Sequence, residues 1–233
     1  MVSHQHRLLV GANGWVHASW RDRFYPEDLP DDWQLTYYSN EFRVVLLPTH
    51  YWDIAGEGPS QWLDACDGDF AFVVEVPAEL IQRALHDPVG REDLVVWSNR
   101  CQTLGPQCLG LLVEVRDEVD AGALEPLLAD LSEAFNVCVE IVGAGARDAL
   151  WRLAQNLQLG LVWDGQGESP RFGWGELAVT RLRRAPADLR GLRRVVEHAC
   201  ELTATPRTAV LLVDIEPPDI EVMRQAEVIA NLL

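Results

Sequence analysis

The chain contains no lysine. All nineteen basic residues are arginine, and thirty-six aspartates and glutamates outnumber them to give a net charge of −17. A negative field of this size repels phosphate backbones, so the composition argues against general nucleic-acid binding. A salty cytoplasm would also favour a surface rich in aspartate and glutamate, and a GC-rich genome would favour arginine codons. The net charge therefore argues against nucleic acids as partners and does not indicate an activity.

Long apolar runs are missing as well. No stretch approaches the ~20 apolar residues that a membrane-spanning helix needs, and Met1–Arg7 lead into a predicted strand without a signal-like segment. The five cysteines are odd in number, lack a C-x-x-C pair and are scattered along the chain. This usage suits a reducing compartment and argues against structural zinc. We expect a cytoplasmic protein that does not act at a membrane.

Two motifs are absent. The opening glycines, Gly11-Ala12-Asn13-Gly14, do not form the G-x-G-x-x-G of a dinucleotide site, and no acid ends the second predicted strand. No G-x-S-x-G motif occurs, and no serine or cysteine lies next to a convincing base. Cys138 is predicted to be a core residue. These absences disfavour nucleotide-dependent redox chemistry and nucleophilic catalysis.

The chain does contain a recurring sequence pattern. It is a short run of apolar residues that ends in an aspartate or glutamate and is followed by residues that interrupt a strand. Helical stretches separate the runs, which predicts parallel strands whose C-terminal ends lie on one face. The terminal acids of the five runs are Glu75, Glu114, Glu140, Asp164 and Asp214.

Eight such strands alternate with helices, which predicts a (β/α)8 TIM-like barrel in a single domain over residues 1–233, with an open doubly wound sheet as the alternative. The predicted strands are 8–12, 43–47, 70–76, 109–115, 137–142, 159–163, 177–182 and 209–215. The predicted helices are 32–39, 60–66, 91–104, 121–134, 146–157, 187–202 and 218–232.

The N-terminal block resembles a known family. It reads Val10-Gly11-Ala12-Asn13-Gly14-Trp15, then Trp20-Arg21, Phe24-Tyr25-Pro26, Leu29-Pro30 and Tyr37-Tyr38. This ordered set is similar to the opening of the YecE-like proteins, uncharacterised-domain family 72, and the match is strong over residues 9–42. The resemblance implies a TIM-like barrel and implies no reaction.

The chain departs from the pattern of those relatives at the predicted strand ends. Glu140 and Arg181 are kept. Elsewhere the typical polar residues are replaced, with Leu46 and Pro48 on strand two, Glu75 on strand three, Glu114 on strand four, Val142 on strand five, Arg183-Arg184 on strand seven and Asp214 on strand eight. If relatives have an active site at these strand ends, this chain has rebuilt or lost much of it.

The strand-end acids are expected to converge on one pocket. Two carboxylates ~6 Å apart repel by about 2.8 kcal/mol at an effective dielectric of ~20, so several pairs would rival the net stability of a domain. The cluster therefore needs pairing with Arg181, raised pKa values, water access or a bound cation. Mg²⁺ or Mn²⁺ would suit all-oxygen ligation, with His17 and His50 near enough in sequence to add nitrogen.

These considerations leave two hypotheses. The first is a divergent, non-catalytic barrel that binds a small polar or anionic ligand, or a protein partner, at its C-terminal face. The second is a metal-assisted or general acid–base enzyme, of hydrolase or isomerase type, acting on a small phosphorylated or sugar-like substrate. Glu140, Asp164 and Arg181 are the candidate catalytic residues. The candidate ligand-binding residues are Gly11, Asn13, Trp15, Glu75, Glu114 and Asp214.

Two further features, the tryptophans and an arginine-rich segment, each have two interpretations. Trp15, together with Trp163 and Trp174, either forms a stacking platform for a ligand or packs the barrel rim. Residues 177–207 hold seven arginines and three acids, which makes this segment either a seat for an anionic ligand or acidic protein, or a solvated helix. The sequence carries no signal that identifies a cofactor or an oligomeric state.

Overall fold

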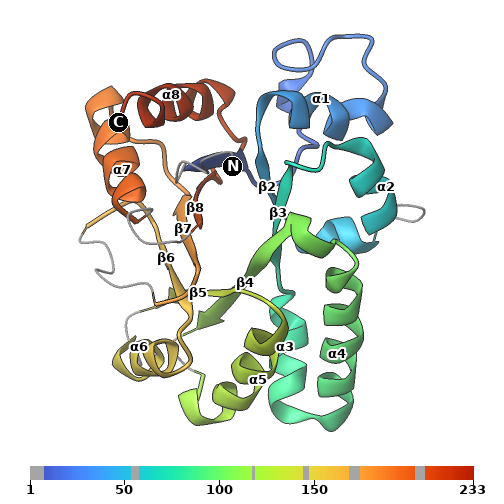
Figure 1. Ribbon diagram of the computed structural model, residues 1–233, viewed down its shortest axis with the longest axis vertical. Coiled ribbons are helices and arrows are strands. Elements are labelled where there is room, and N and C mark those ends of the chain that lie inside the picture. The colour runs from blue at the N-terminus through green and yellow to red at the C-terminus, as the bar shows by residue number, and fades with distance from the viewer. Residues whose placement is uncertain (1–7, 54–57, 117–118, 144–146, 168–173, 203–207) are drawn as a thin grey trace, which may run out of the picture.

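Eight parallel strands form one sheet in the order β1-β8-β7-β6-β5-β4-β3-β2, with helices around it (Figure 1). The structure is a computed structural model that describes residues 8–53, 58–116, 119–143, 147–167, 174–202 and 208–233. The strands are β1 Leu9–Ala12, β2 Val44–Leu47, β3 Ala71–Glu75, β4 Cys108–Arg116, β5 Val137–Val142, β6 Gly160–Trp163, β7 Leu177–Leu182 and β8 Thr208–Val213. The predicted (β/α)8 barrel is confirmed, and each predicted strand is found within two residues of its expected bounds.

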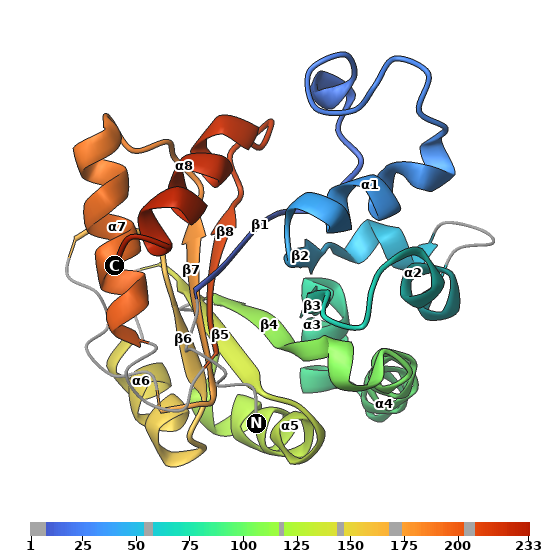
Figure 2. The same cartoon turned by 45° about the horizontal axis from the view of Figure 1, so that its top comes forward.

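Helices follow the strands along the chain, with two helices between β3 and β4 and none among the described residues between β6 and β7. They are α1 Gln34–Glu41, α2 Pro59–Ala65, α3 Ala78–His86, α4 Pro88–Gln102, α5 Ala121–Ala134, α6 Arg147–Asn156, α7 Leu189–Glu201 and α8 Ile220–Ala230. Short 3-10 turns lie at Ala18–Trp20, Asp31–Trp33, Thr49–Asp53 and Gly105–Gln107. Figures 1 and 2 show α6 to α8 on one side of the strands and α1 to α4 on the other. None of these helices is long and apolar enough to cross a bilayer.

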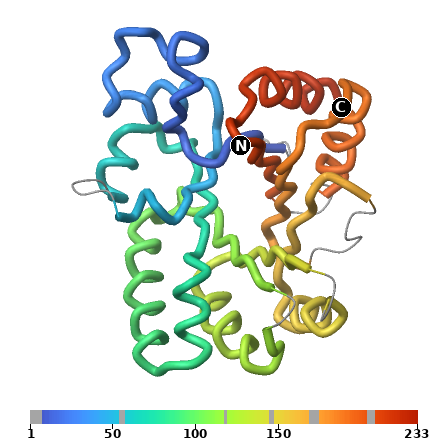
Figure 3. The backbone as a smooth tube through the Cα atoms, turned by 180° about the vertical axis from the view of Figure 1, so that it is seen from behind, coloured from blue at the N-terminus to red at the C-terminus, as the bar shows by residue number. Residues whose placement is uncertain are grey.

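One helix was not predicted. α3 follows Pro77 directly, and its five apolar residues were not recognised as a helix because Pro88, which follows so soon, suggests a loop. Instead, Asp87 caps the next helix by accepting a hydrogen bond from the Val89 amide, so the two helices meet with no intervening loop. Figure 3 shows them side by side, and a Cβ on Gly90 would lie 2.4 Å from the Arg83 carbonyl carbon.

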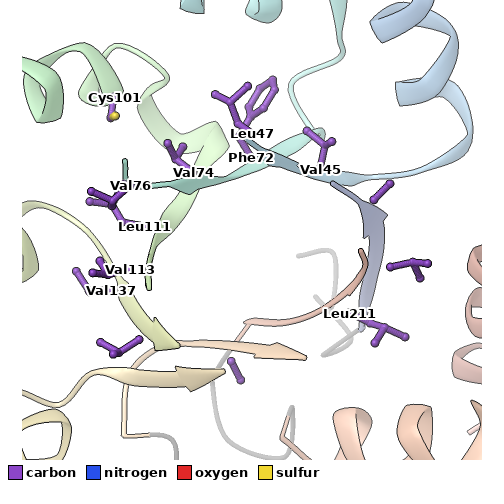
Figure 4. Packing of buried hydrophobic residues seen from close by; sticks show 14 of the residues in the cluster. Val45, Leu47, Phe72, Val74, Val76, Cys101, Leu111, Val113, Val137 and Leu211 are labelled. Carbon is purple, nitrogen blue, oxygen red and sulfur yellow. The ribbon is translucent and has the colours of Figure 1, made fainter. Parts of the chain in front are cut away.

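The strands carry apolar side chains on both faces. One set forms an interior cluster that includes Val73, Leu112, Cys138 and Val179, which confirms the prediction for Cys138. The alternate residues, among them Val74 and Val113, join a larger cluster with the helices, and Figure 4 shows such side chains projecting away from the ring of strands. Burial on both faces is typical of parallel sheets and stabilises the barrel from inside and outside.

The first and second strands complete the barrel with few direct contacts. They are joined by a bridge between Asn13 and Leu46 and by the Gly14 amide, which donates to the Leu46 carbonyl at 2.8 Å. Below this bridge, the Tyr38 hydroxyl accepts a hydrogen bond from the Ala12 amide at 2.9 Å and donates to the Val44 carbonyl at 3.0 Å. A buried phenol thus takes the place of a direct ladder bond between β1 and β2.

Candidate functional site

The strand-end acids and basic residues share the interior face of the barrel. Side chains on a strand alternate between faces, and Glu75, Glu140 and Arg181 each lie two residues after an interior apolar residue of the same strand. Glu114 and Glu140 are directly paired in register across β4 and β5. Four of the five acids expected to converge, Glu75, Glu114, Glu140 and Asp214, therefore come together at the C-terminal end of the strands, where ligands of such barrels bind, whereas Asp164 does not join them.

Arg181 on β7 is the centre of this group. Its Nη1 donates to Glu140 Oε2 at 2.9 Å, its Nη2 to Glu75 Oε1 at 2.9 Å, and its Nε to Asp214 Oδ2 at 2.7 Å. The side chain is only 5% exposed, so these ion pairs are screened little by water. Burial alone would lower the pKa of the Arg181 guanidinium, but the three carboxylates together raise it. Every nitrogen of Arg181 is engaged, which makes it a positioning residue for the acids.

Arg183 is a second cation at the same end of the barrel, and it is 41% exposed. Its Nη1 and Nη2 contact the two oxygens of Glu140 at 2.6 and 3.1 Å, and Nη2 also lies 3.3 Å from Glu114. Sequence reasoning did not select this residue as a site residue. Arg183 lies one residue past the end of β7, and no local pattern in the sequence marked it as part of the site.

Glu140 lies between the two guanidiniums. Burial raises the pKa of its carboxyl above the ordinary value, while the charges of Arg181 and Arg183 oppose that shift. The result is a carboxyl group that holds its proton to higher pH than an exposed glutamate and remains next to a partly exposed arginine. This combination is suited to hydrogen bonding of a polar ligand and to proton transfer.

Asn13 connects β1 to this group. Its Nδ2 donates to Asp214 Oδ1 at 2.6 Å, and its carbonyl oxygen is 2.9 Å from His17 Nε2. Burial lowers the pKa of the His17 imidazole, so at neutral pH the ring is uncharged. Asp214 therefore receives hydrogen bonds on both oxygens, from Asn13 and from Arg181.

Asp164 lies apart from the Arg181 group within the described residues. Its side chain is exposed, and Oδ1 accepts a hydrogen bond from the Gln166 amide at 2.9 Å across a turn. Gly165 has a φ of 77°, a left-handed conformation that glycine adopts without strain. The carboxylate is thus held at the rim, where it lines a pocket together with Glu140.

Gly11 and Trp15 occupy structural positions. A Cβ on Gly11 would lie 2.0 Å from the Val44 carbonyl oxygen, so the glycine permits the close approach of β1 and β2. Trp15 is 4% exposed, its ring packs edge-on against Tyr51 at 4.3 Å, and its carbonyl accepts from the Tyr25 hydroxyl. These contacts match the rim-packing interpretation of Trp15. Trp174, predicted within a glycine-rich loop, is half-buried, and residues 168–173 of that loop lie outside the described residues.

A pocket of about 550 Å³ opens between β5 and β6. The two strands pair over only two residue pairs, Cys138–Gly160 and Val139–Leu161, and the pocket begins where this pairing stops. Its lining includes Glu140 and Asp164, Arg147 and Arg183, and two aromatic rings, Trp151 and Trp163. Trp151 on α6 packs against the core and is half-buried, and it also lines the pocket.

The geometry does not favour the cation hypothesis. No group of three or more histidine, cysteine, aspartate or glutamate residues in the described part of the chain is arranged to hold a metal ion. Arg181 stands between the carboxylates that would have been its ligands. His50 is exposed and packs against Tyr51. The repulsion expected among the acids is relieved by guanidinium groups.

The chain is a (β/α)8 barrel with a charged group and a polar pocket at the C-terminal ends of its strands, a fold that by itself does not specify a function. The sequence matches the family model described as "Protein of unknown function DUF72" over residues 9–209, and the chain belongs to that family. The YecE-like resemblance is thereby confirmed. A search of curated proteins returns no match to the chain.

Proposed function

We propose that the protein binds a small polyhydroxylated, sugar-like ligand in the pocket between β5 and β6. The observation that carries this proposal is the Glu140–Arg183 pair, which is held in place by Arg181 and opens onto a cavity of about 550 Å³. Pockets of this size at the C-terminal face of a barrel are suited to ligands of a few dozen atoms.

The lining of this pocket suits the hydroxyl-bearing, uncharged part of a ligand. Two carboxylates, Glu140 and Asp164, are matched by two guanidiniums, Arg147 and Arg183, so the formal charges of the described lining residues sum to zero. Carboxylates accept and guanidiniums donate hydrogen bonds, and a hydroxyl group can do both. The ring of Trp151 offers an apolar face for the carbon skeleton of such a ligand.

Calorimetric titration with a panel of neutral pentoses, hexoses and cyclic polyols tests the proposal. We expect saturable binding of at least one compound, weakened about tenfold or more by Glu140→Gln or Arg147→Gln, because each substitution removes a charge-assisted hydrogen bond. Arg152→Gln is the matched control, since Arg152 is exposed on the same helix as Arg147 and is not among the pocket residues. Failure of the whole panel to bind, or equal weakening by Arg152→Gln, contradicts the proposal.

A second candidate is general acid–base catalysis on the same ligand, with Glu140 as the acid. The raised pKa of Glu140 favours it, because a carboxyl that keeps its proton to a higher pH than an exposed glutamate can donate that proton to a leaving or carbonyl oxygen. Incubation of a binding polyol or its glycoside with the protein, followed by NMR, should show conversion that Glu140→Gln abolishes. If conversion persists in this variant, Glu140 is not the catalytic acid.

A further inference from the structure

A second pocket, also of about 550 Å³, lies between the turn after β6 and the beginning of α7. Its only charged lining residues among those described are Arg184 and Arg194, with His198 beside them. No carboxylate from the described residues lines it, although acids outnumber basic residues almost two to one in the whole chain. The described lining of this pocket is therefore positively charged, whereas the protein as a whole has a net charge of −17 and a negative field.

The two arginines are available to a ligand. Within the described part of the chain neither Arg184 nor Arg194 forms an ion pair, and both are exposed. By contrast, Arg193 on the same helix is paired with Glu197 at 2.7 Å. Two unneutralised guanidiniums facing one cavity repel each other and gain from an anion between them.

His198 adds a polar group to this pocket. Its Nε2 is buried and has no hydrogen-bond partner among the described residues, while Nδ1 lies 3.4 Å from Glu201. An unpaired buried ring nitrogen carries an energetic cost that a ligand can relieve. Without a hydrogen this nitrogen can accept a hydrogen bond from the hydroxyl of a monoprotonated phosphate, and with a hydrogen it can donate one to a phosphate oxygen.

The start of α7 is not the basis of this assignment. Asp188 caps the helix by accepting a hydrogen bond from the Gly191 amide at 2.7 Å, so part of the helix end is already satisfied. The attraction for an anion comes from the arginine side chains.

The second pocket adjoins the first. Trp163, Gln166 and Gly167 line both, so one ligand of modest size can extend from one cavity into the other. The Trp163 indole is fixed between them, because its Nε1 donates to the Gln166 carbonyl at 2.8 Å and its ring packs on His198 with centroids 4.8 Å apart.

We propose that the ligand is a phosphorylated polyol whose phosphate binds Arg184, Arg194 and His198 and whose hydroxyl groups reach Glu140 and Arg183. The proposal rests on the proposed function and names its substrate class. Phosphate suits the site better than a carboxylate, because its three terminal oxygens can serve two guanidiniums and an imidazole at once.

Calorimetric titration with inorganic phosphate, at fixed ionic strength set with chloride, tests the anion site alone. We expect saturable binding that Arg184→Gln and Arg194→Gln each weaken about tenfold or more, as expected for loss of a charge-assisted hydrogen bond. The double variant Arg190→Gln/Arg193→Gln removes two charges from the exposed face of α7, twice the loss in either test variant, and should leave binding unchanged. Absence of saturable binding, or equal weakening in the control pair, overturns the anion site.

A hexose phosphate and the unphosphorylated hexose then test whether one ligand spans both pockets. Glu140→Gln should weaken the hexose phosphate and leave inorganic phosphate unaffected, whereas Arg194→Gln should weaken both phosphates and leave the neutral hexose unaffected. If phosphate binds as expected but Glu140→Gln has no effect on the hexose phosphate, the spanning ligand is wrong. If no neutral polyol binds while inorganic phosphate does, the proposed function fails and the anion site stands.

Discussion

Arg181 Nη1 donates to Glu140 Oε2 at 2.9 Å inside the mouth of the barrel, between residues that are forty-one positions apart in the chain. This contact joins β7 to β5 and positions Glu140, one of the two acids that line the pocket between β5 and β6. Because Arg181 also binds Glu75 and Asp214, a single guanidinium fixes acids from three strand ends. Positioning of the site and stability of the barrel are therefore coupled through Arg181.

Replacement of Arg181 by glutamine should destabilise the protein severely. The change leaves three carboxylates partly buried without their main counter-charge, and breaking a buried ion pair by removal of one partner costs about 3–5 kcal/mol. Urea unfolding followed by circular dichroism measures this free energy. Arg183→Gln is the comparison, and since Arg183 is 41% exposed the loss should be much smaller. Equal losses in the two variants would show that Arg181 is not the central cation.

The contribution of Glu140 to stability should decline with rising pH. Its carboxyl ionises near pH 4.5 in the unfolded chain, and burial raises the pKa in the folded protein. The folded state therefore binds more protons than the unfolded state between these two values, so the stabilisation is complete below pH 4.5 and is lost as the pH rises through the folded pKa. The difference in unfolding free energy between wild type and Glu140→Gln, measured across this range, should fall. A difference that grows with pH would mean that the two arginines outweigh burial.

Tyr38→Phe should weaken the junction of β1 and β2. The substitution keeps the ring, which is fully buried, and removes the hydroxyl that joins the Ala12 amide to the Val44 carbonyl. Two buried backbone groups lose their partner, at a cost of about 1–3 kcal/mol each. Denaturant titration gives the value, with Tyr37→Phe, a half-buried neighbour on the same helix, as control. A Tyr38→Phe protein as stable as wild type would show that the strands pair without the phenol.

Gly11→Ala distinguishes a structural glycine from a ligand-binding one. The new methyl group would lie 2.0 Å from the Val44 carbonyl oxygen, and the backbone of β1 or β2 must shift to relieve that overlap. We expect a stability loss of about 1–3 kcal/mol, as for overpacking in a core. Gly68→Ala is the control, because a Cβ there meets nothing within 4 Å. Unchanged stability combined with weakened polyol binding would instead return Gly11 to the ligand site.

Much of the fold could be predicted from the sequence because strand and helix signals alternate along it. Each apolar run that ends in Glu75, Glu140 or Asp214 indicates a strand and the region where that strand ends. The helix α3 was missed because the break at Pro88 resembles a loop, whereas Asp87 turns it into the start of α4. The predicted helix 218–232 begins at Ile220 in the structure, since Asp219 caps it by accepting from the Glu221 and Val222 amides.

The site could be predicted only in part. Strands that are apolar on both faces show no alternation, so the sequence did not reveal which acids face inward. Convergence of Glu75, Glu114, Glu140 and Asp214 was expected, but the separate position of Asp164 depends on its local turn with Gln166. The role of Arg183 depends on the register between β7 and its neighbours, which no local pattern records. Functional roles for all these residues remain predictions.

A double-mutant cycle between Arg181 and Glu140 tests the central claim most directly. Unfolding free energies of wild type, Arg181→Gln, Glu140→Gln and the double variant give the interaction energy of the pair. We predict a coupling of about 1–3 kcal/mol, with the double variant more stable than the sum of the single losses implies. Additive losses, within about 0.5 kcal/mol, would contradict the account, because they would mean that the two side chains do not form the ion pair on which the pocket is built.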